Sequence, residues 1–345
     1  MFGLVNPVNS MDISIIIPVY NVSSFIEKCI KSVFDQSFRD FECIIVNDGT
    51  KDNSIEVVEA IIKGDKRFKV FHQKNQGQGM ARNLGLKHAQ GKYICFIDAD
   101  DYVETNYLEV MYREIEKQKV DIVCCGFNIL RKDKVSSQLI SLEASSNIES
   151  ILHLLNGNDW GSLFNRMFKS NLVKDLNFNK GIGQDKPFIF QLFVRHPISK
   201  VVYIKQCLYN YIIRKQSATN SMSKKKIDNL IENIIVNPLN LVRASSYYIN
   251  CKGELEYYLV MSYLYIISNI AKNSNQFEFE AKYFKNKFSE VYDLKLWASI
   301  KLLVHSRLSF FKKFFSVFQL ILSHFNGIGF RFYKLIYVFK KQSLI

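Results

Sequence analysis

The sequence predicts an α/β fold, a mostly parallel sheet with helices on both faces, followed by a helical and basic C-terminal region. Short apolar runs alternate with helical patterns of about ten residues throughout residues 13–125, which is typical of βαβ units. Polar clusters follow several of these runs directly. From residue 216 onward, 18 basic side chains against 8 acidic ones lie among many large aromatic residues.

Each predicted element has its own local signal. The strands are short runs rich in β-branched and aromatic residues, as expected of strands buried on both faces. The helices carry apolar residues three and four positions apart. We expect strands over residues 13–19, 41–46, 68–71, 93–97 and 120–125, and helices over residues 23–34, 55–62, 79–91 and 108–115.

Composition excludes several classes of protein. The 345 residues are 48% hydrophobic and contain only 5 Pro and 15 Gly, which excludes a collagen-like or largely disordered chain. No apolar stretch of about 18 residues runs without charge, and no signal-peptide pattern opens the chain, so we expect neither a transmembrane helix nor secretion. The 7 cysteines contain no CxxC pair and predict reduced thiols in a cytoplasmic protein.

The polar clusters lie where ligands gather in such sheets. Asn21 follows the first predicted strand, Asp48 follows the second, and the acidic run 98–101 follows the fourth. Ligands of open α/β sheets bind at the carboxyl ends of the strands. We therefore expect these groups to share one site.

The acidic run predicts a metal site. Asp98, Asp100 and Asp101 repel one another unless a cation or hydrogen-bond donors compensate. Oxygen ligands suit Mg²⁺ or Mn²⁺, which commonly bridge phosphate oxygens. The alternative is a helix start, but one Asp suffices as a cap. Asp48 by itself fits a turn residue better than a ligand-binding one.

Known nucleotide-binding loops are absent from the sequence. Residues 76–83 contain two glycines but do not form a GxGxxG motif and do not directly follow a strand. No GxxxxGK followed by Ser or Thr occurs either. A dinucleotide-binding fingerprint and a P-loop are both excluded.

Five motifs follow one another along the chain: residues 14–21 (SIIIPVYN), 46–54 (VNDGTKDNS), 75–77 (NQG), 81–85 (ARNLG) and 96–101 (FIDADD). In this order they resemble the motifs of family 2 glycosyltransferases of the GT-A fold, of the type that builds bacterial surface polysaccharide or lipooligosaccharide. The resemblance is specific over residues 13–105 and weaker to about residue 220.

The resemblance implies a nucleotide-sugar donor. In that family the acid in the position of Asp48 holds the nucleotide base, usually uracil, and the residues around Pro18 and Tyr20 line the same pocket. We expect Asn21 to bind the donor as well. The region of Arg82 flanks the sugar and phosphates of the donor.

The resemblance also implies a divalent metal, Mn²⁺ or Mg²⁺. In the family's DxD motif, Asp98 and Asp100 contact the ribose and the metal, with Asp100 the direct ligand. Residues 209–217 (YNYIIRKQS) resemble a later family segment in which an Arg and a Ser close over the diphosphate, which implies donor-binding roles for Arg214 and Ser217. The alternative for Arg214 is a surface strand residue.

Family 2 enzymes invert the anomeric centre, so one carboxylate must deprotonate the acceptor hydroxyl. The family places this base in a Glu-Asp pair at the start of a later helix. The matching segment here is residues 183–190 (GQDKPFIF), which implies that Asp185 is the catalytic base. Gln184 replaces the usual Glu, so this chain lacks a charge beside the base.

A second departure lies at residues 160–164 (WGSLF). Many family members carry Lys where this chain has Ser162. We expect Arg166 or Lys169 to take over the corresponding contact with phosphate or acceptor.

The basic C-terminal region predicts attachment to an anionic membrane surface. No acidic residue follows Asp293, whereas nine basic residues lie between 295 and 341, and helical spacing aligns Phe311 with Phe314, Phe315 and Phe318. Basic and aromatic side chains on amphipathic helices are typical of interfacial anchors. A packed helical subdomain with a basic exterior is a compatible alternative, and we expect no nucleic-acid partner.

Together with these features, the resemblance implies an inverting glycosyltransferase that moves a hexose or N-acetylhexosamine from a UDP-sugar to a hydroxyl of a glycan or lipid-linked acceptor in surface polysaccharide biosynthesis. We expect it on the inner face of the cell membrane. The expected domains are 11–220, with a donor half to about 125 and an acceptor half from 126, and 221–345. The alternative is a non-catalytic membrane- or nucleic-acid-binding protein on the same scaffold.

Overall fold

The computed structural model describes residues 11–132, 134–139, 142, 146–198, 200–214, 223–273, 283–284 and 286–288. These residues fall into two compact units. The first contains the described residues of 1–150 and 161–214, and the second contains 151–160 with the described residues beyond 214. The expected domain boundary near residue 220, Ser217 and the aromatic tail beyond residue 294 all lie outside the described residues.

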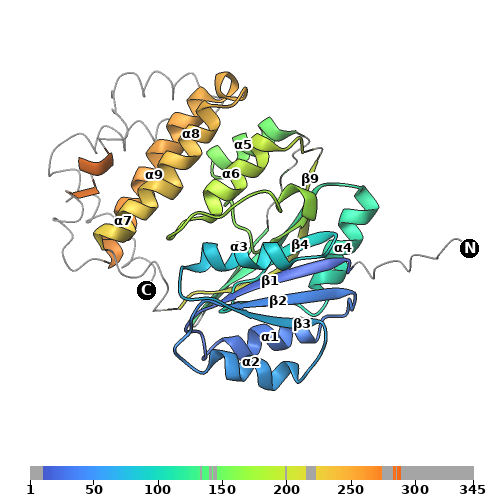
Figure 1. Ribbon diagram of the computed structural model, residues 1–345. Helices are drawn as coiled ribbons and strands as arrows, with labels where there is room; N and C mark the ends of the chain where they lie inside the picture. The colour runs from blue at the N-terminus through green and yellow to red at the C-terminus, as the bar shows by residue number, and fades with distance from the viewer. Residues whose placement is uncertain are drawn as a thin grey trace, which may run out of the picture. The chain divides into compact units, whose positions relative to one another are not determined.

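The first unit is built on a sheet whose first four strands are parallel, as predicted. β1 lies between β2 and β4, and β3 extends the sheet beyond β2 (Figure 1). Every residue of β1 is buried, which explains its uninterrupted β-branched sequence. The four strands are β1 (Ile13–Val19), β2 (Phe41–Asn47), β3 (Phe68–His72) and β4 (Tyr93–Phe96).

Beyond β4 the sheet becomes mixed. The full order is β3-β2-β1-β4-β8-β6-β9-β5, with β7 paired to β6. β6 and β9 are parallel, whereas β8 lies antiparallel to both of its neighbours. β6 is longer than the predicted 120–125 because its second half pairs with β7 and β9. The strands are β5 (Tyr102–Val103), β6 (Ile122–Arg131), β7 (Lys134–Gln138), β8 (Arg166–Lys169) and β9 (Val201–Ile212).

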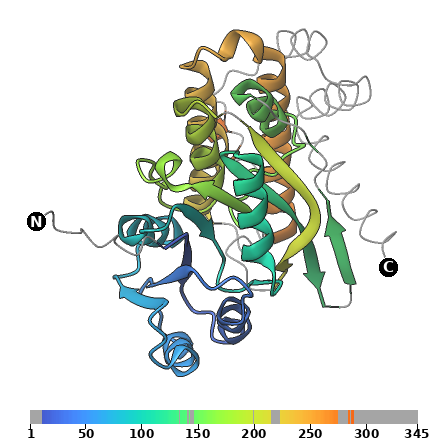
Figure 2. The same ribbon diagram turned by 90° about the vertical axis from the view of Figure 1, so that its right-hand side faces the viewer.

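Helices cover both faces of this sheet, which confirms the predicted α/β fold class. Alternate β1 residues Ile13, Ile15 and Ile17 share one buried cluster with side chains of α1, α2 and α4. On the opposite face Ile16 meets α3, and Phe96 packs edge-on against Phe188 of α6. Figures 1 and 2 show this layering. The helices are α1 (Ile26–Phe34), α2 (Ser54–Ile62), α3 (Gln78–His88), α4 (Tyr107–Gln118) and α6 (Asp185–Arg195).

The strand order creates a switch point beside β1. The chain proceeds from β1 outward to β2 and β3 and then returns to place β4 on the other side of β1. Loops leaving the carboxyl ends of β1 and β4 therefore diverge, which opens the sheet edge to ligands. Asn21, Asp48 and Asp98 follow β1, β2 and β4 at this edge.

The second unit is helical wherever it is described beyond residue 222, apart from short turns. Its interior contains Ile235, Val242 and Ile266, and the buried Tyr258 hydroxyl donates to the carbonyl of Ile234 at 2.6 Å. None of the described helices combines the length and apolarity needed to cross a bilayer. The helices are α7 (Lys224–Leu230), α8 (Asn237–Arg243) and α9 (Lys252–Asn273), while α5 (Asn147–Leu155) lies at the boundary between the units.

Six of the seven cysteines are buried, and Cys207 is partly exposed. The thiols of Cys43 and Cys95 lie inside the sheet, where burial raises their pKa values well above that of a free thiol.

Candidate functional site

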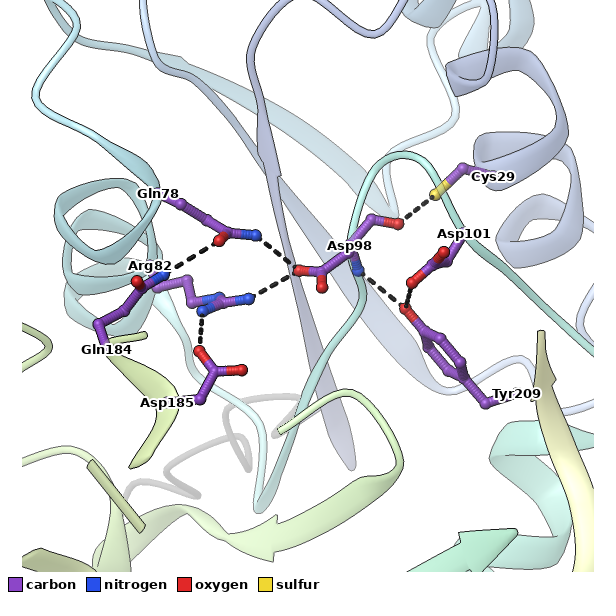
Figure 3. Close-up of polar contacts among 8 residues, drawn as sticks. All are labelled: Cys29, Gln78, Arg82, Asp98, Asp101, Gln184, Asp185 and Tyr209. Carbon is purple, nitrogen blue, oxygen red and sulfur yellow. Dashed lines mark hydrogen bonds and ion pairs between the residues drawn. The ribbon is translucent and has the colours of Figure 1, made fainter. Parts of the chain in front are cut away.

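Asp98 is the centre of a polar network at the carboxyl end of β4. Its Oδ1 atom accepts hydrogen bonds from Arg82 Nη2 at 2.7 Å and from Gln78 Nε2 at 2.8 Å. Its backbone N–H donates to the Tyr209 hydroxyl at 3.2 Å. Figure 3 shows these groups converging from α3, β4 and β9. The network therefore joins parts of the chain up to 111 residues apart.

Arg82 joins two acidic residues of the predicted site. Its guanidinium is 1% exposed, and Nη1 donates to Asp185 Oδ1 at 2.7 Å while Nη2 contacts Asp98 (Figure 3). Burial by itself lowers the pKa of Arg82, but the two carboxylates outweigh it and raise the pKa. A buried cation of this kind requires such anionic partners. The structure thus brings three sequence-predicted residues into direct contact.

Asp185 stands at the start of α6, where the helix dipole favours a negative charge. Its side chain is 29% exposed. Burial and the nearby charge of Asp98 raise the pKa of Asp185, and Arg82 opposes this shift. A carboxylate with a raised pKa is a better proton acceptor than an ordinary one. Asp185 thus combines partial exposure with a raised pKa.

Asp100 faces Arg214, which follows β9. Arg214 Nε lies 2.7 Å from Asp100 Oδ2, and both side chains are about one-fifth exposed, at 23% and 21%. Burial and the charge of Asp98 raise the pKa of Asp100, while Arg214 lowers it. The alternative of a simple surface role for Arg214 does not account for this ion pair.

Asp101 differs from its two acidic neighbours. Its side chain is buried and accepts hydrogen bonds from the Tyr209 hydroxyl at 2.7 Å and the Ile212 backbone N–H at 2.8 Å. Burial, together with Asp100 and Asp98, raises its pKa. Hydrogen bonds from Tyr209 and Ile212 of β9 thus satisfy Asp101, whereas the metal site was predicted at Asp98 and Asp100. Within the described residues no three acidic, His or Cys side chains gather as a metal site.

Asp48, at the end of β2, is buried and holds the loop before α3. Oδ1 accepts from Gln73 Nε2 at 2.7 Å and from the Gln76 N–H at 2.9 Å, and Oδ2 accepts from the Gly77 N–H at 2.8 Å. Gly77 has a φ of 95°, which favours glycine. A carboxylate offers about four acceptor positions, and hydrogen bonds from described residues occupy three of those of Asp48.

The remaining predicted donor-binding residues lie at the same sheet edge. Pro18 is buried in β1 opposite Val46, and Tyr20 is 41% exposed. Asn21 has a φ of 50°, and its Oδ1 accepts from the Lys51 N–H at 2.9 Å. Asn21 thus joins the loops after β1 and β2. Ser217 lies outside the described residues.

Neither basic residue expected to compensate for Ser162 reaches this site. Arg166 is fully buried in β8, where its Nε donates to the Ser162 carbonyl at 2.6 Å. Lys169 binds Asp121 Oδ1 at 2.7 Å. Both side chains instead bind groups that precede strands, the Ser162 carbonyl before β8 and the Asp121 carboxylate before β6.

Sequence reasoning assigned no role to Gln78 or Tyr209, and it noted Gln184 only as a departure from the family's Glu-Asp pair. Gln184 Nε2 donates to Gln78 Oε1 at 3.0 Å, next to the contact between Arg82 and Asp185. A sequence signal existed for Gln78, because it lies four residues before Arg82 and thus on the same helix face. No local signal links Tyr209 to a site more than 100 residues earlier.

Comparison with known families gives a match for residues 14–176 to the model described as glycosyl transferase family 2. The chain is 36% identical over 228 residues to the uncharacterized glycosyltransferase EpsJ of Bacillus subtilis. The aligned region covers 63% of this chain and 65% of EpsJ, so the chain spans just under two thirds of the length of EpsJ. It is 32% identical over 216 residues to an uncharacterized glycosyltransferase of Haemophilus influenzae, covering 62% of this chain and 84% of that one.

Two solved structures share the fold. S. aureus TarS in complex with UDP-GlcNAc superposes with a TM-score of 0.56 at 16% identity, covering 84% of this chain and 92% of TarS. The mannosyltransferase PcManGT of Pyrobaculum calidifontis, in complex with GDP-Man and Mn²⁺, gives a TM-score of 0.52 at 12% identity, covering 91% and 89%. These likenesses confirm the predicted GT-A fold.

Proposed function

Because this chain belongs to glycosyl transferase family 2, and is therefore a transferase, we propose that it moves a hexose or N-acetylhexosamine from a nucleotide-sugar to an acceptor hydroxyl with inversion. One observation carries the proposal. The Arg82 guanidinium connects Asp98, on the donor side, directly to Asp185, the proposed base. A non-catalytic binding protein has no need of a buried arginine that joins these two carboxylates.

We take the donor to be a UDP-sugar. The uracil ring presents one imide N–H, which matches the one acceptor position that the hydrogen bonds of Asp48 leave. Guanine presents an N–H and an amino group side by side and suits a carboxylate with both oxygens open. The complex of TarS with UDP-GlcNAc supports this choice, and that of PcManGT with GDP-Man makes GDP-sugars the competitor to test.

Asp98 and Asp100 fit a divalent cation, Mn²⁺ or Mg²⁺. Both are hard oxygen ligands, and their mutual repulsion contributes to the raised pKa of Asp100. Arg82 and Gln78 both engage Oδ1 of Asp98, and no described residue engages its Oδ2. Two carboxylates would suffice to hold such an ion, because Mg²⁺ sites commonly use one or two carboxylates together with substrate phosphates. When bound, the ion would neutralise charge on the departing diphosphate.

The proton of the acceptor hydroxyl passes to Asp185. Arg82 holds Oδ1 of this carboxylate, so Oδ2 is the atom that receives the proton. The acceptor oxygen bonds to the anomeric carbon as the bond from that carbon to the phosphate oxygen breaks, and the nucleoside diphosphate leaves. Arg214, paired with Asp100, is positioned to stabilise the charge on the leaving group.

The acceptor in this proposal is a glycan or lipid-linked sugar at the inner face of the cell membrane. The support is the basic and aromatic sequence of the C-terminal region, of which residues 289–345 lie outside the described residues. Co-sedimentation of the full chain with vesicles containing anionic lipid tests this part. We expect the chain to sediment with anionic vesicles and not with neutral ones. Absence of binding to anionic vesicles would reject the membrane partner.

A binding screen followed by one substitution tests the catalytic proposal. UDP, GDP and CDP with their common sugars are added with and without Mn²⁺, and thermal unfolding is followed. At 100-fold excess over Kd, binding stabilises the fold by about 2.7 kcal/mol. No stabilisation by any nucleotide in a folded sample would reject the proposed donor class.

Asp185→Asn then separates catalysis from binding. Loss of the general base is expected to lower nucleoside diphosphate release by ~10²–10⁴-fold, with donor affinity within about twofold of the parent. Asp40→Asn, at an exposed loop position, serves as the control. Retained turnover in Asp185→Asn would show that another group is the base.

A further inference from the structure

Two parallel bridges connect Asp98 to the start of α6 (Figure 3). In the first, Arg82 binds both Asp98 and Asp185 at 2.7 Å. In the second, Gln78 binds Asp98 at 2.8 Å and Gln184 at 3.0 Å. Both bridges start at Asp98 Oδ1 and end on consecutive residues. Such a pair fixes an orientation as well as a distance, because rotation about one bridge stretches the other.

Chemistry fixes the direction of the second bridge. The Asp98 carboxylate only accepts hydrogen bonds, so the Gln78 side chain must turn its NH₂ group toward it. The Gln78 carbonyl then faces Gln184, which must donate through its own NH₂ group. A Glu at position 184 has no proton to donate when ionised. The second bridge therefore requires an amide at position 184.

The position of Gln184 on its helix is unusual for a purely structural residue. It occupies the N-cap of α6, yet its side chain makes no capping hydrogen bond and is 3% exposed. Side chains of Ser, Thr, Asp and Asn cap helices much better than Gln. Gln184 therefore does not stabilise α6 by side-chain capping, and its side chain binds Gln78 instead.

The backbone around this contact is arranged for a close approach. Gly181 and Gly183, just before Gln184, have φ values of 91° and 77°, a region that favours glycine. At Gly79 on α3, a Cβ atom would lie 2.4 Å from the Asn179 carbonyl oxygen and 3.3 Å from Gln184 Cγ. The loop before α6 therefore lies directly against the first turn of α3.

We propose that Gln78 and Gln184 are positioning residues that hold the first turn of α6 at a set distance and angle from Asp98, and so align Asp185 with the bound donor. This inference rests on the proposed function, in which Asp185 is the base. Neither glutamine transfers a proton. A misplacement of about 1 Å can lower turnover by 10²-fold, so a bridge of this kind has a measurable effect.

Gln184→Asn is the discriminating substitution. Asn keeps the amide but is one methylene shorter, so it cannot span to Gln78, and it is a better N-cap than Gln. We expect the melting temperature to stay equal or rise, while kcat for UDP or GDP release from UDP-glucose, UDP-N-acetylglucosamine or GDP-mannose with Mn²⁺ falls at least tenfold. The affinity for UDP with Mn²⁺ should stay within about twofold. If Gln184 were merely structural, kcat would instead stay equal or rise together with the melting temperature.

Gln191→Asn provides the matched control, because it makes the same change on the same helix at a half-buried position. Its kcat should equal that of the parent within about twofold. Gln78→Met removes the other end of the bridge and should lower kcat to a similar degree. The double variant Gln78→Met/Gln184→Asn should be no slower than the slower single variant, because both changes break one bridge.

Hydrogen exchange gives a readout that does not depend on turnover. In Gln78→Met, the backbone amides of residues 184–186 and 188 should exchange at least several-fold faster, although the substitution lies on α3. Three results would each overturn the proposal. They are unchanged exchange in this segment, an unchanged kcat in Gln184→Asn, and a double variant whose decrease in kcat equals the product of the two single decreases.

The experiment distinguishes this failure from failure of the proposed function. If Asp185→Asn keeps its turnover, the base assignment fails whatever the glutamine variants do. If Asp185→Asn is inactive and Gln184→Asn is fully active, the base stands and only the positioning role is lost.

Discussion

Replacing Arg82 with Met removes the charge at the centre of the site and keeps a side chain of similar length. Arg82 is 1% exposed, and its carboxylate partners Asp98 and Asp185 are 17% and 29% exposed. Removing one partner of a buried ion pair costs about 3–5 kcal/mol, because the other charge is left without compensation. Water reaches part of both carboxylates, so we expect a loss near the lower end, about 3 kcal/mol of unfolding free energy.

The loss should depend on pH. Burial and Asp98 already raise the pKa of Asp185 above the ordinary aspartate value of about 3.9, and Arg82 opposes this rise. Without Arg82 the pKa rises further. A carboxyl group whose folded pKa exceeds its unfolded value favours folding below the unfolded pKa, and that advantage is lost as the pH rises through the folded pKa. The deficit of Arg82→Met should thus be largest at neutral pH and shrink toward pH 4.

Urea unfolding followed by circular dichroism measures this effect at several pH values. Adding Asp185→Asn to Arg82→Met should restore about 1–2 kcal/mol at neutral pH, because one uncompensated charge is removed. Arg113→Met, at a position 61% exposed, is the control and should change stability by less than about 0.5 kcal/mol. A loss below 1 kcal/mol for Arg82→Met, or further destabilisation by Asp185→Asn, would refute this reasoning.

Three further predictions concern the surroundings of the site. Asp100→Asn should weaken Mn²⁺-dependent nucleotide binding at least tenfold in calorimetry, and equal affinity with and without Mn²⁺ in the parent would contradict the assignment. Tyr209→Phe leaves the buried Asp101 with one donor fewer and should lower unfolding free energy by about 1–3 kcal/mol, whereas an unchanged melting temperature would argue against an anchoring role. Gly79→Ala places a Cβ 2.4 Å from the Asn179 carbonyl and should destabilise by about 1–3 kcal/mol in urea unfolding, unless α3 shifts freely.

The fold was largely predictable because its signals are local. The β-branched run of β1 and the spacing of apolar residues in α1 and α4 gave strands and helices close to those observed. The mixed half of the sheet was not predicted in detail. β8 inserts antiparallel between β4 and β6 through pairings more than 40 residues apart, and no local pattern encodes that order.

The residues of the site could be predicted where they lie in a family motif. Asp98, Asp100 and Asp185 were identified by their resemblance to family motifs, and the structure brings Asp98 and Asp185 to a single guanidinium. The structure also separated Asp101 from its neighbours. Three adjacent aspartates look alike in a sequence, but only Asp101 points at the donors that β9 provides.

Arg166 is a residue for which the prediction from sequence was wrong. As a basic residue near the expected position it was a reasonable substitute for a missing Lys, yet it lies fully buried in β8 and binds the Ser162 carbonyl. A sequence shows that a residue is charged, but whether the charge faces a ligand or the interior depends on which strands flank it.

The sequence by itself determined the alternation of strands and helices, the acidic ends of the strands and the family to which the motifs point, since these depend on neighbours a few residues apart. The tertiary structure decided which carboxylate is bound to which donor. Arg82 meets Asp98 and Asp185 across 16 and 103 residues, and Gln78 meets Gln184 across 106. Hydrogen bonds form only within about 3 Å, and packing of α3 and α6 on one sheet face brings these atoms within that distance.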